Sequence, residues 1–176
     1  MRTISLFSGC GGLDLGAEKA GAEIKYSIDV DKDSVATLEK YFPGSSTRLG
    51  DIREEKRFPK ADLVIGGYPC QSFSMGGNRN PKNDPRTYLY KEFARCLDVV
   101  EPKFFVAENV SGLKSLKNGS FLDEQFRVLE KAGPKGYRIT AQVLDARDFG
   151  VPQRRKRIFI VGVRRDLKTP CSRFSL

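Results

Sequence analysis

The segment GGYPCQSFS, residues 66–74, holds the side chain best suited to covalent chemistry. It follows the apolar run ADLVI at 61–65, which predicts a short buried strand that ends at two glycines. Cys70 would then lie beyond the carboxyl end of that strand, where ligands bind in open α/β sheets. A thiolate at this place is a candidate nucleophile; the alternative is a small, buried, apolar cysteine.

The chain has no histidine, which argues against Cys-His and Ser-His-Asp hydrolases and against the usual zinc sites. The four cysteines (Cys10, Cys70, Cys96 and Cys171) form no CxxC pair and no disulfide framework, so we expect reduced thiols and no metal. A nucleophilic Cys70 must work without a histidine base. That restriction suits attack on an already electrophilic carbon better than amide hydrolysis.

Three further elements indicate an adenosyl ligand. FSGCGG at 7–12 allows a tight turn and close approach of a ligand to the backbone, although a turn without a ligand is the alternative. Asp14 stands where a GxGxxG fingerprint has its last glycine, which disfavours NAD. Asp29 is placed to accept from ribose hydroxyls; Asp31 could do the same, and either could cap the following helix. Asp51 could accept a hydrogen bond from an adenine amino group. The chain has no P-loop lysine pattern, so we expect an adenosyl ligand without a pyrophosphate.

Two polar groups near the end of the chain are candidates for holding a base. Glu108 ends the apolar run at 103–109, and a protonated Glu108 with a raised pKa could donate to a ring nitrogen. The alternative for Glu108 is a helix cap or an ion pair. In QRRKR at 153–157, Arg155 and Arg157 would share one face of an extended chain and suit phosphate or base oxygens. The alternative for this segment is a solvated hairpin tip.

The remaining pattern predicts one α/β domain at 1–165 and a polar, poorly ordered tail at 166–176. Helices are expected near 15–22, 32–42, 86–100 and 120–132, the last with a capping box at Ser120 and Asp123. Strands are expected at 3–7, 24–30, 46–49, 61–65, 103–109, 137–146 and 157–163. The loop between the last two strands is too short for a helical crossover, so they should pair antiparallel. The fold class is therefore a doubly wound, mostly parallel seven-stranded sheet with an antiparallel edge strand.

The net charge of +9 is unevenly distributed along the chain. Residues 101–176 carry 16 Lys and Arg against 8 Asp and Glu, which predicts a polyanion partner at one edge, or else a solvated basic face. No signal peptide is visible, and no apolar run approaches the roughly 20 residues that span a bilayer. We therefore expect no membrane partner and a location in a bacterial or phage cytosol.

These motifs together resemble those of the cytosine-5 DNA methyltransferases. The resemblance covers the chain from Thr3 to about Arg165, with the motifs in the family's order. They are FSGCGG, Asp29, GDI at 50–52, GGYPCQSFS, DPRTYLYKEF at 84–93, ENV at 108–110 and GVPQRRKR at 150–157. The combination of PCQ, ENV and QRRKR is highly specific.

The resemblance implies transfer of a methyl group from S-adenosylmethionine to C5 of cytosine in DNA. Cys70 would add to cytosine C6, Glu108 would hold and protonate N3, Arg157 would bind O2, and Arg155 would bind a phosphate or the cysteine loop. The cytosine must leave the duplex to reach such a pocket. The cofactor residues that the resemblance implies are Phe7 (against the adenine face), Gly9, Gly11, Gly12, Asp29, Val30, Asp51, Ile52 and Leu89.

Two residues depart from the family pattern: Asp29 stands where glutamate is more usual, and Thr87 where glycine is often found. The family's target-recognition region and final helix should follow residue 176. We therefore expect a split or truncated enzyme that a second polypeptide completes. The alternatives are an RNA cytosine-5 methyltransferase, and a non-catalytic module that binds S-adenosylmethionine or a partner chain.

Overall fold

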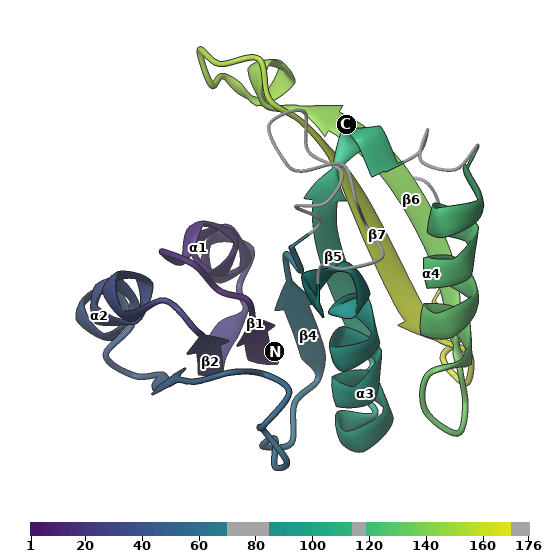
Figure 1. Cartoon of the computed structure of the whole chain (residues 1–176), viewed down its shortest axis with the longest axis horizontal. Helices are drawn as coiled ribbons and strands as arrows, with labels where there is room; N and C mark the ends of the chain where they lie inside the picture. Colours follow the sequence, from purple (N-terminus) through teal and green to yellow (C-terminus); the bar gives the residue numbers. More distant parts are fainter. Residues whose placement is uncertain (70–84, 114–118, 170–176) are drawn as a thin grey trace.

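The computed structural model describes residues 1–69, 85–113 and 119–169, so the predicted nucleophile Cys70 lies outside the described residues. Within them, seven strands form one sheet in the order β3-β2-β1-β4-β5-β7-β6. Figure 1 shows this sheet with helices on both faces. The strands are β1 Arg2–Leu6, β2 Glu23–Asp29, β3 Ser46–Leu49, β4 Leu63–Gly66, β5 Phe104–Val110, β6 Tyr137–Asp145 and β7 Lys156–Arg164.

The pairing of the strands confirms the predicted fold class. Strands β3, β2, β1, β4 and β5 run parallel to one another. Strand β7 runs antiparallel to both β5 and β6, as expected for the last two predicted strands. The reversed strand β7 lies one position inside the sheet, because β6 forms the edge.

Four α-helices of the described residues cover the two faces of the sheet (Figure 1). Helices α1 Gly12–Lys19 and α2 Lys32–Tyr41 pack on one face, and α3 Tyr90–Val100 and α4 Ser120–Lys131 pack on the other. The helix expected at 86–100 begins instead as a 3₁₀ turn, η2 Pro85–Tyr88. A second 3₁₀ turn, η4 Ala146–Phe149, follows β6.

The predicted capping box of α4 is wrong. The N-cap of this helix is Gly119, which has a φ of 90° and makes no side-chain cap, and Ser120 is already its first helical residue. The first residues of the tail that was expected to be poorly ordered are held by hydrogen bonds to β6. Arg138 donates to the carbonyl oxygens of Leu167 at 2.7 Å and Thr169 at 2.8 Å. None of the helices in the described ranges is long and apolar enough to cross a membrane.

Alternation along β5 assigns its side chains to two apolar layers. Phe105 and Ala107 are fully buried in the cluster that includes α3 and α4. Phe104 and Val106 pack against the cluster that includes α1 and α2. Glu108 is the next residue whose side chain points to this second face. Its carboxylate therefore lies near the carboxyl edge of the sheet, at the end of a strand that packs against apolar side chains on both faces.

A buried carboxylate lies beneath the turn between β1 and α1. Asp14 is fully buried, and it accepts hydrogen bonds from the hydroxyls of Ser5 at 2.9 Å and Ser27 at 3.2 Å. The Ser8 hydroxyl donates to the Ser5 hydroxyl at 2.9 Å and so joins the same network. Burial raises the pKa of Asp14 above its ordinary value, although the two serine hydroxyls oppose that shift. The residue that broke the dinucleotide fingerprint therefore connects β1, β2 and α1.

Removal of this acceptor should destabilise the fold. We expect Asp14→Leu to lower the free energy of unfolding by about 1–3 kcal/mol, because the hydroxyls of Ser5 and Ser27 lose a buried acceptor. Asp14→Asn keeps one acceptor oxygen and serves as the matched control. Urea unfolding at neutral pH measures the difference, and equal stability of the leucine and asparagine variants would contradict the role.

The raised pKa adds a pH dependence with a defined sign. The folded state favours the protonated Asp14, so its contribution is fully present below the ordinary aspartate pKa and is lost as pH rises through the raised value. The stability of the wild type relative to Asp14→Asn should therefore fall as the pH rises from about 4, the ordinary aspartate value, towards neutral. Urea unfolding across this range checks it, because the other titrating groups are common to both proteins.

Candidate functional site

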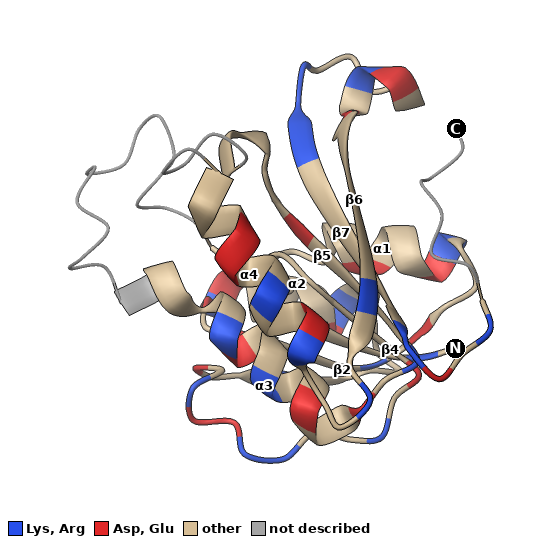
Figure 2. Cartoon of the chain, turned by 90° about the vertical axis from the view of Figure 1, so that its right-hand side faces the viewer, with Lys and Arg blue, Asp and Glu red and all other residues tan. Residues whose placement is uncertain are grey.

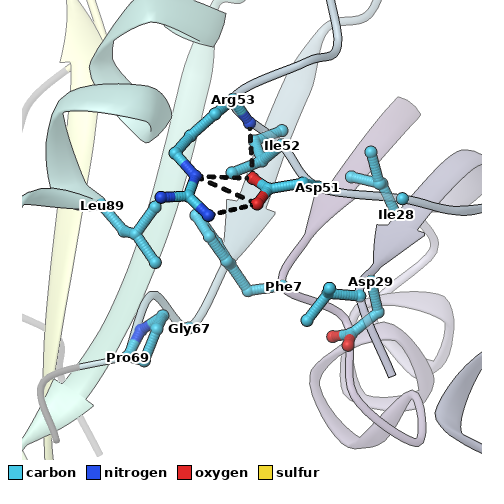
Figure 3. Close-up of a pocket in the computed structure, with 11 residues that line it drawn as sticks. Phe7, Ile28, Asp29, Asp51, Ile52, Arg53, Gly67, Pro69 and Leu89 are labelled. Carbon is cyan, nitrogen blue, oxygen red and sulfur yellow. Dashed lines mark hydrogen bonds and ion pairs between the residues drawn. The ribbon is translucent and has the colours of Figure 1, made fainter. Parts of the chain in front are cut away.

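A cavity of about 530 Å³ opens at the carboxyl edge of β1, β2 and β4, and its size fits a small-molecule ligand. Figure 3 shows side chains from separate loops turned around it. Predicted cofactor residues that line this cavity are Phe7, Asp29, Val30, Asp51, Ile52 and Leu89. Its other lining residues are Ile28, Gly50, Arg53, Gly67 and Pro69.

The three predicted glycines are not among the lining residues, but they shape the loop beside the cavity. Gly9 and Gly11 have φ values of 52° and 83°, which favour glycine. A Cβ on Gly11 would lie 2.6 Å from Cε2 of Phe42, so Gly11 is needed where the loop packs on α2. A Cβ on Gly9 or Gly12 would meet nothing within 4 Å. Those two positions leave open space of the kind that an adenosyl ligand could use.

Asp29 connects the glycine loop to the start of α2, one carboxylate oxygen to each. Oδ2 accepts from the Gly9 amide at 2.8 Å, and Oδ1 accepts from the Asp31 amide at 2.9 Å. Asp31 itself caps α2, because its carboxylate accepts from the Ser34 amide at 2.8 Å. A helix cap was the alternative role for both Asp29 and Asp31, and Asp31 is the residue that makes it. Asp29 ends β2 at the cavity with its remaining lone pairs available to a ligand.

Asp51 lies two residues beyond β3 and carries a partner that the sequence reasoning missed. The Arg53 side chain turns back onto it, with Nε 3.0 Å from each carboxylate oxygen and Nη2 bonded to Oδ2 (Figure 3). The hydrogen bonds from Arg53 hold the pKa of Asp51 below its ordinary value. The signal available in the sequence was an arginine directly after GDI, in a segment already assigned to the adenine.

The loop that carries Asp51 and Ile52 is also held from α3, by a residue that the sequence reasoning did not identify. Arg95 donates to the carbonyl oxygen of Ile52 at 2.7 Å and to that of Glu55 at 2.8 Å. The Arg95 guanidinium lies 5.6 Å from the ring centre of Phe58. The wall of the cavity is therefore fastened to the helix that follows Leu89.

A second cavity, of about 360 Å³, lies on the open face of β5, β7 and β6 and contains the predicted base-binding residues. It is lined by Glu108, Leu144, Ala146, Phe149, Arg155, Arg157 and Phe159. Strand register places them together, because Glu108 pairs with Phe159, and Arg157 pairs with both Val110 and Leu144. Arg157 begins this face one residue inside β7, and Arg155 lies in the preceding loop. The predicted convergence of Glu108, Arg155 and Arg157 is found.

Glu108 combines an ion pair with a raised pKa. Its Oε1 lies 2.8 Å from Nε of Arg157, so the ion pair that was one alternative for Glu108 is present. Burial nevertheless raises the pKa of Glu108, while the charges of Arg157 and Arg155 act in the opposite direction. This carboxyl group is therefore easier to protonate than an ordinary glutamate, as a donor to a ring nitrogen requires.

The segment immediately before Cys70 connects the two cavities. Gly67 lines the first cavity, and a Cβ on it would lie 3.1 Å from Oε2 of Glu108 in the second. Two hydrogen bonds hold the next residue, Tyr68. The side-chain Nδ2 of Asn109 donates to the Tyr68 carbonyl oxygen at 3.1 Å, and the Tyr68 hydroxyl donates to Oε1 of Gln125 at 2.8 Å. Gln125 is 1 % exposed, and no sequence signal connected it with this site.

The β6–β7 end of the molecule gathers basic side chains beside the second cavity. Figure 2 shows Lys and Arg at the end of the β6–β7 hairpin, both in the connection and at the start of β7, and the sequence identifies them as Arg147, Arg154, Arg155, Lys156 and Arg157. Phe149 is 53 % exposed among them. Such a surface suits a polyanion. Within the described part of the chain, no group of three or more acidic or Cys side chains is arranged to hold a metal ion.

The two glycines Gly11 and Gly12 should separate packing from ligand binding. We expect Gly11→Ala to lower the unfolding midpoint, because the added methyl meets Phe42 and the backbone has a positive φ. Gly12→Ala should keep the midpoint, since its methyl has open space, but weaken binding of S-adenosylhomocysteine by filling that space. Thermal unfolding and ligand-observed NMR measure the two effects. Unchanged binding in Gly12→Ala would remove that position from the ligand site.

Loss of the cation beside Glu108 should raise the pKa of Glu108 further. Arg157 lowers that pKa, so Arg157→Gln should move the Glu108 titration to higher pH. Carboxyl ¹³C NMR titration, assigned with Glu108→Gln, measures the shift. Arg154→Gln is the matched control, because Arg154 is exposed and is not among the causes of the Glu108 shift. Equal titration curves in the two arginine variants would contradict the coupling.

Comparison with known proteins agrees with this geometry. The chain is 44 % identical to the type II methyltransferase M.FnuDI of Fusobacterium nucleatum over 95 % of its length, and spans 48 % of that relative. It is 40 % identical to M.AquIA of Picosynechococcus sp., covering 93 % of this chain and 72 % of that relative. An E. coli prophage protein described as a DNA modification methyltransferase superposes with a TM-score of 0.83 at 32 % identity, over 98 % of this chain and 49 % of that one.

The chain therefore spans about half the length of several curated relatives that it matches. The family model of C-5 cytosine-specific DNA methylases matches residues 1–175, which include both cavities and the segment between them. The chain belongs to the C-5 cytosine-specific DNA methylase family.

Proposed function

We propose that this chain forms the S-adenosylmethionine-binding and catalytic part of a DNA cytosine-5 methyltransferase. The observation that carries the proposal is the position of Gly67, which lines the first cavity and lies against Glu108 of the second. A methyl donor and a base bound in these cavities would meet at the segment that leads into Cys70. The second cavity argues against the alternative of a non-catalytic module, because a module that only binds the cofactor needs no site for a base.

When bound, S-adenosylmethionine supplies the methyl group. Asp29 would accept from the ribose hydroxyls, Asp51 would accept from the adenine amino group, and Phe7 and Leu89 would enclose the adenine ring. Cys70 Sγ forms a bond to cytosine C6, which makes C5 nucleophilic enough to take the methyl group. Loss of the C5 proton to water and elimination of Cys70 as a thiolate then restore the aromatic ring.

Glu108 and Arg157 suit the remaining edge of the base. N3 and O2 are neighbouring acceptors on one edge of cytosine, both bonded to C2, and the two side chains that would bind them also lie side by side, with Nε of Arg157 2.8 Å from Oε1 of Glu108. A protonated Glu108 donates to N3 and draws electrons from C6 as Cys70 adds. The raised pKa of Glu108 supports this step, because it keeps the proton available closer to neutral pH.

DNA is the substrate that the description of the family and that of the E. coli prophage protein favour, and the basic end of the β6–β7 hairpin suits its phosphates. We assign recognition of the target sequence to the half of the relatives that this chain does not span. We propose that this part acts with the chain, either in one polypeptide or as a second one. An RNA substrate of the same chemistry is an outcome of the test below.

The test traps the covalent step. The chain is combined with the C-terminal half of M.FnuDI as a separate polypeptide, with tritiated S-adenosylmethionine and DNA that contains 5-fluorocytosine. We expect a denaturation-resistant adduct that Cys70→Ser abolishes, while Cys10→Ser, its matched control, retains it. An adduct that survives Cys70→Ser would refute the assignment of the nucleophile, and a preference for 5-fluorocytosine RNA would change the substrate.

Cofactor binding is tested separately on the chain itself. Asp29→Ala should weaken binding of S-adenosylhomocysteine by about 1–3 kcal/mol, because the ribose loses a charged acceptor and the Gly9 amide loses its partner. Asp33→Ala is the control, since Asp33 lies on α2 and does not line the cavity. Equal affinity of Asp29→Ala and the wild type in ligand-observed NMR would remove Asp29 from the site.

A further inference from the structure

Helix α4 accepts hydrogen bonds from two tyrosine hydroxyls at neighbouring positions. The Tyr68 hydroxyl donates to Oε1 of Gln125 at 2.8 Å, and the Tyr90 hydroxyl donates to Oε1 of Glu124 at 2.7 Å. Tyr68 lies two residues beyond β4, and Tyr90 is the first residue of α3, which packs beside α4 on the same face of the sheet (Figure 1). One turn of α4 is therefore fastened to the carboxyl edge of the sheet and to the start of α3.

Tyr68 is held through its backbone as well as its side chain. The side chain is buried, and its ring centre lies 5.8 Å from that of Phe93. Its carbonyl oxygen accepts from Nδ2 of Asn109 at 3.1 Å, and Oδ1 of the same amide accepts from the Val110 backbone at 2.8 Å, which sets the orientation of the amide. Asn109 directly follows Glu108 in β5. Tyr68 therefore connects α4 to the strand that carries the carboxylate of the second cavity.

The position of Tyr68 determines that of Gly67, the residue between the two cavities. Gly66 pairs with Ala107, so Gly67 and Glu108 come next along the two parallel segments. A Cβ on Gly67 would lie 3.1 Å from Oε2 of Glu108, so the backbone closely covers this carboxylate. The cover contributes to the burial that raises the pKa of Glu108. A displacement of Tyr68 would therefore open the place where the cavities meet and admit water to Glu108.

We propose that Gln125 is a positioning residue for the base pocket: its hydrogen bond with Tyr68 holds Gly67 against Glu108 where the two cavities meet. The bond suits this role because Gln125 is buried, so water does not readily replace a lost partner. Tyr68 also stands two residues before the proposed nucleophile Cys70, so we expect the same bond to influence the covalent step. Only this second effect rests on the proposed function.

The first experiment measures the titration of Glu108 in the full chain by carboxyl ¹³C NMR. Gln125→Leu and Tyr68→Phe should each move it to lower pH, because each breaks the bond and lets water reach the carboxyl group. Neither variant changes a charge, and Arg157 and Arg155, the cations that face Glu108, stay in place. The double variant should shift the titration no further than either single variant, since both remove the same bond.

Tyr90→Phe is the matched control. It removes the same hydroxyl group from the neighbouring contact with α4, and Tyr90 is buried like Tyr68, but it belongs to α3 and not to the segment that covers Glu108. Its Glu108 titration should match that of the wild type. A wild-type titration in Gln125→Leu and Tyr68→Phe would overturn the inference. So would an equal shift in Tyr90→Phe, because any lost contact with α4 would then suffice. Urea unfolding of each variant establishes that folded proteins are compared.

The second experiment follows the covalent step in the chain combined with the C-terminal half of M.FnuDI, tritiated S-adenosylmethionine and 5-fluorocytosine DNA. Gln125→Leu and Tyr68→Phe should slow adduct formation at saturating cofactor by about tenfold, because a small misplacement near reacting atoms lowers the rate. Tyr90→Phe should keep the wild-type rate. An unchanged rate in Gln125→Leu would contradict the effect on catalysis. A wild type that forms no adduct would count against the proposed function, while the Glu108 titration still decides the positioning of Gly67.

Discussion

The close approach of β1 and β4 at their carboxyl ends is the constraint on which both cavities depend. A Cβ on Gly66 would lie 2.5 Å from the Leu6 carbonyl oxygen, so the two strands can approach this closely only with a glycine there. Immediately beyond Leu6, Phe7 takes a φ of 53°, which is costly for a residue with a side chain. Asp14 and Asp29 hold that turn through hydrogen bonds from the Ser5 hydroxyl and the Gly9 backbone amide, respectively. One strand end thus supplies Phe7 to the first cavity, and the other supplies Gly67 between the two.

Most of the fold was predictable because its signals are local. Apolar runs of four to nine residues separated by glycine turns are enough to predict parallel strands with helical crossovers, and the short link after 146 predicts the antiparallel pair. The register of β7 was predictable in part: Ile158 and Ile160 are buried, so Arg157 and Phe159 must face the other way, and a slip of one residue would reverse them. The cap of α4 was not predictable, because Gly119 with its positive φ competes with Ser120 for the same role.

The residues of the candidate site divide in the same way. Asp29, Asp51 and Glu108 lie at or near the carboxyl end of a parallel strand, and Arg157 lies at the start of the antiparallel strand β7, so the sequence could place all four at the same edge of the sheet. Arg95 and Gln125 were not predictable, because their partners Ile52 and Tyr68 lie 43 and 57 positions away along the chain. A helical arginine or glutamine of this kind looks like any other polar residue until the helix is docked.

The reversed strand β7 also has a consequence for the order in which the chain folds. Strands β6 and β7 adjoin each other through a short connection that includes η4, so their pairing closes a small loop. The parallel pairing of Thr3 with Leu63 must instead close most of the first third of the chain. Since loop-closure entropy rises with length and non-local pairing slows folding, the hairpin that carries Arg157 forms from local contacts. We therefore expect assembly of the central strands, and with it the first cavity, to be the slow step.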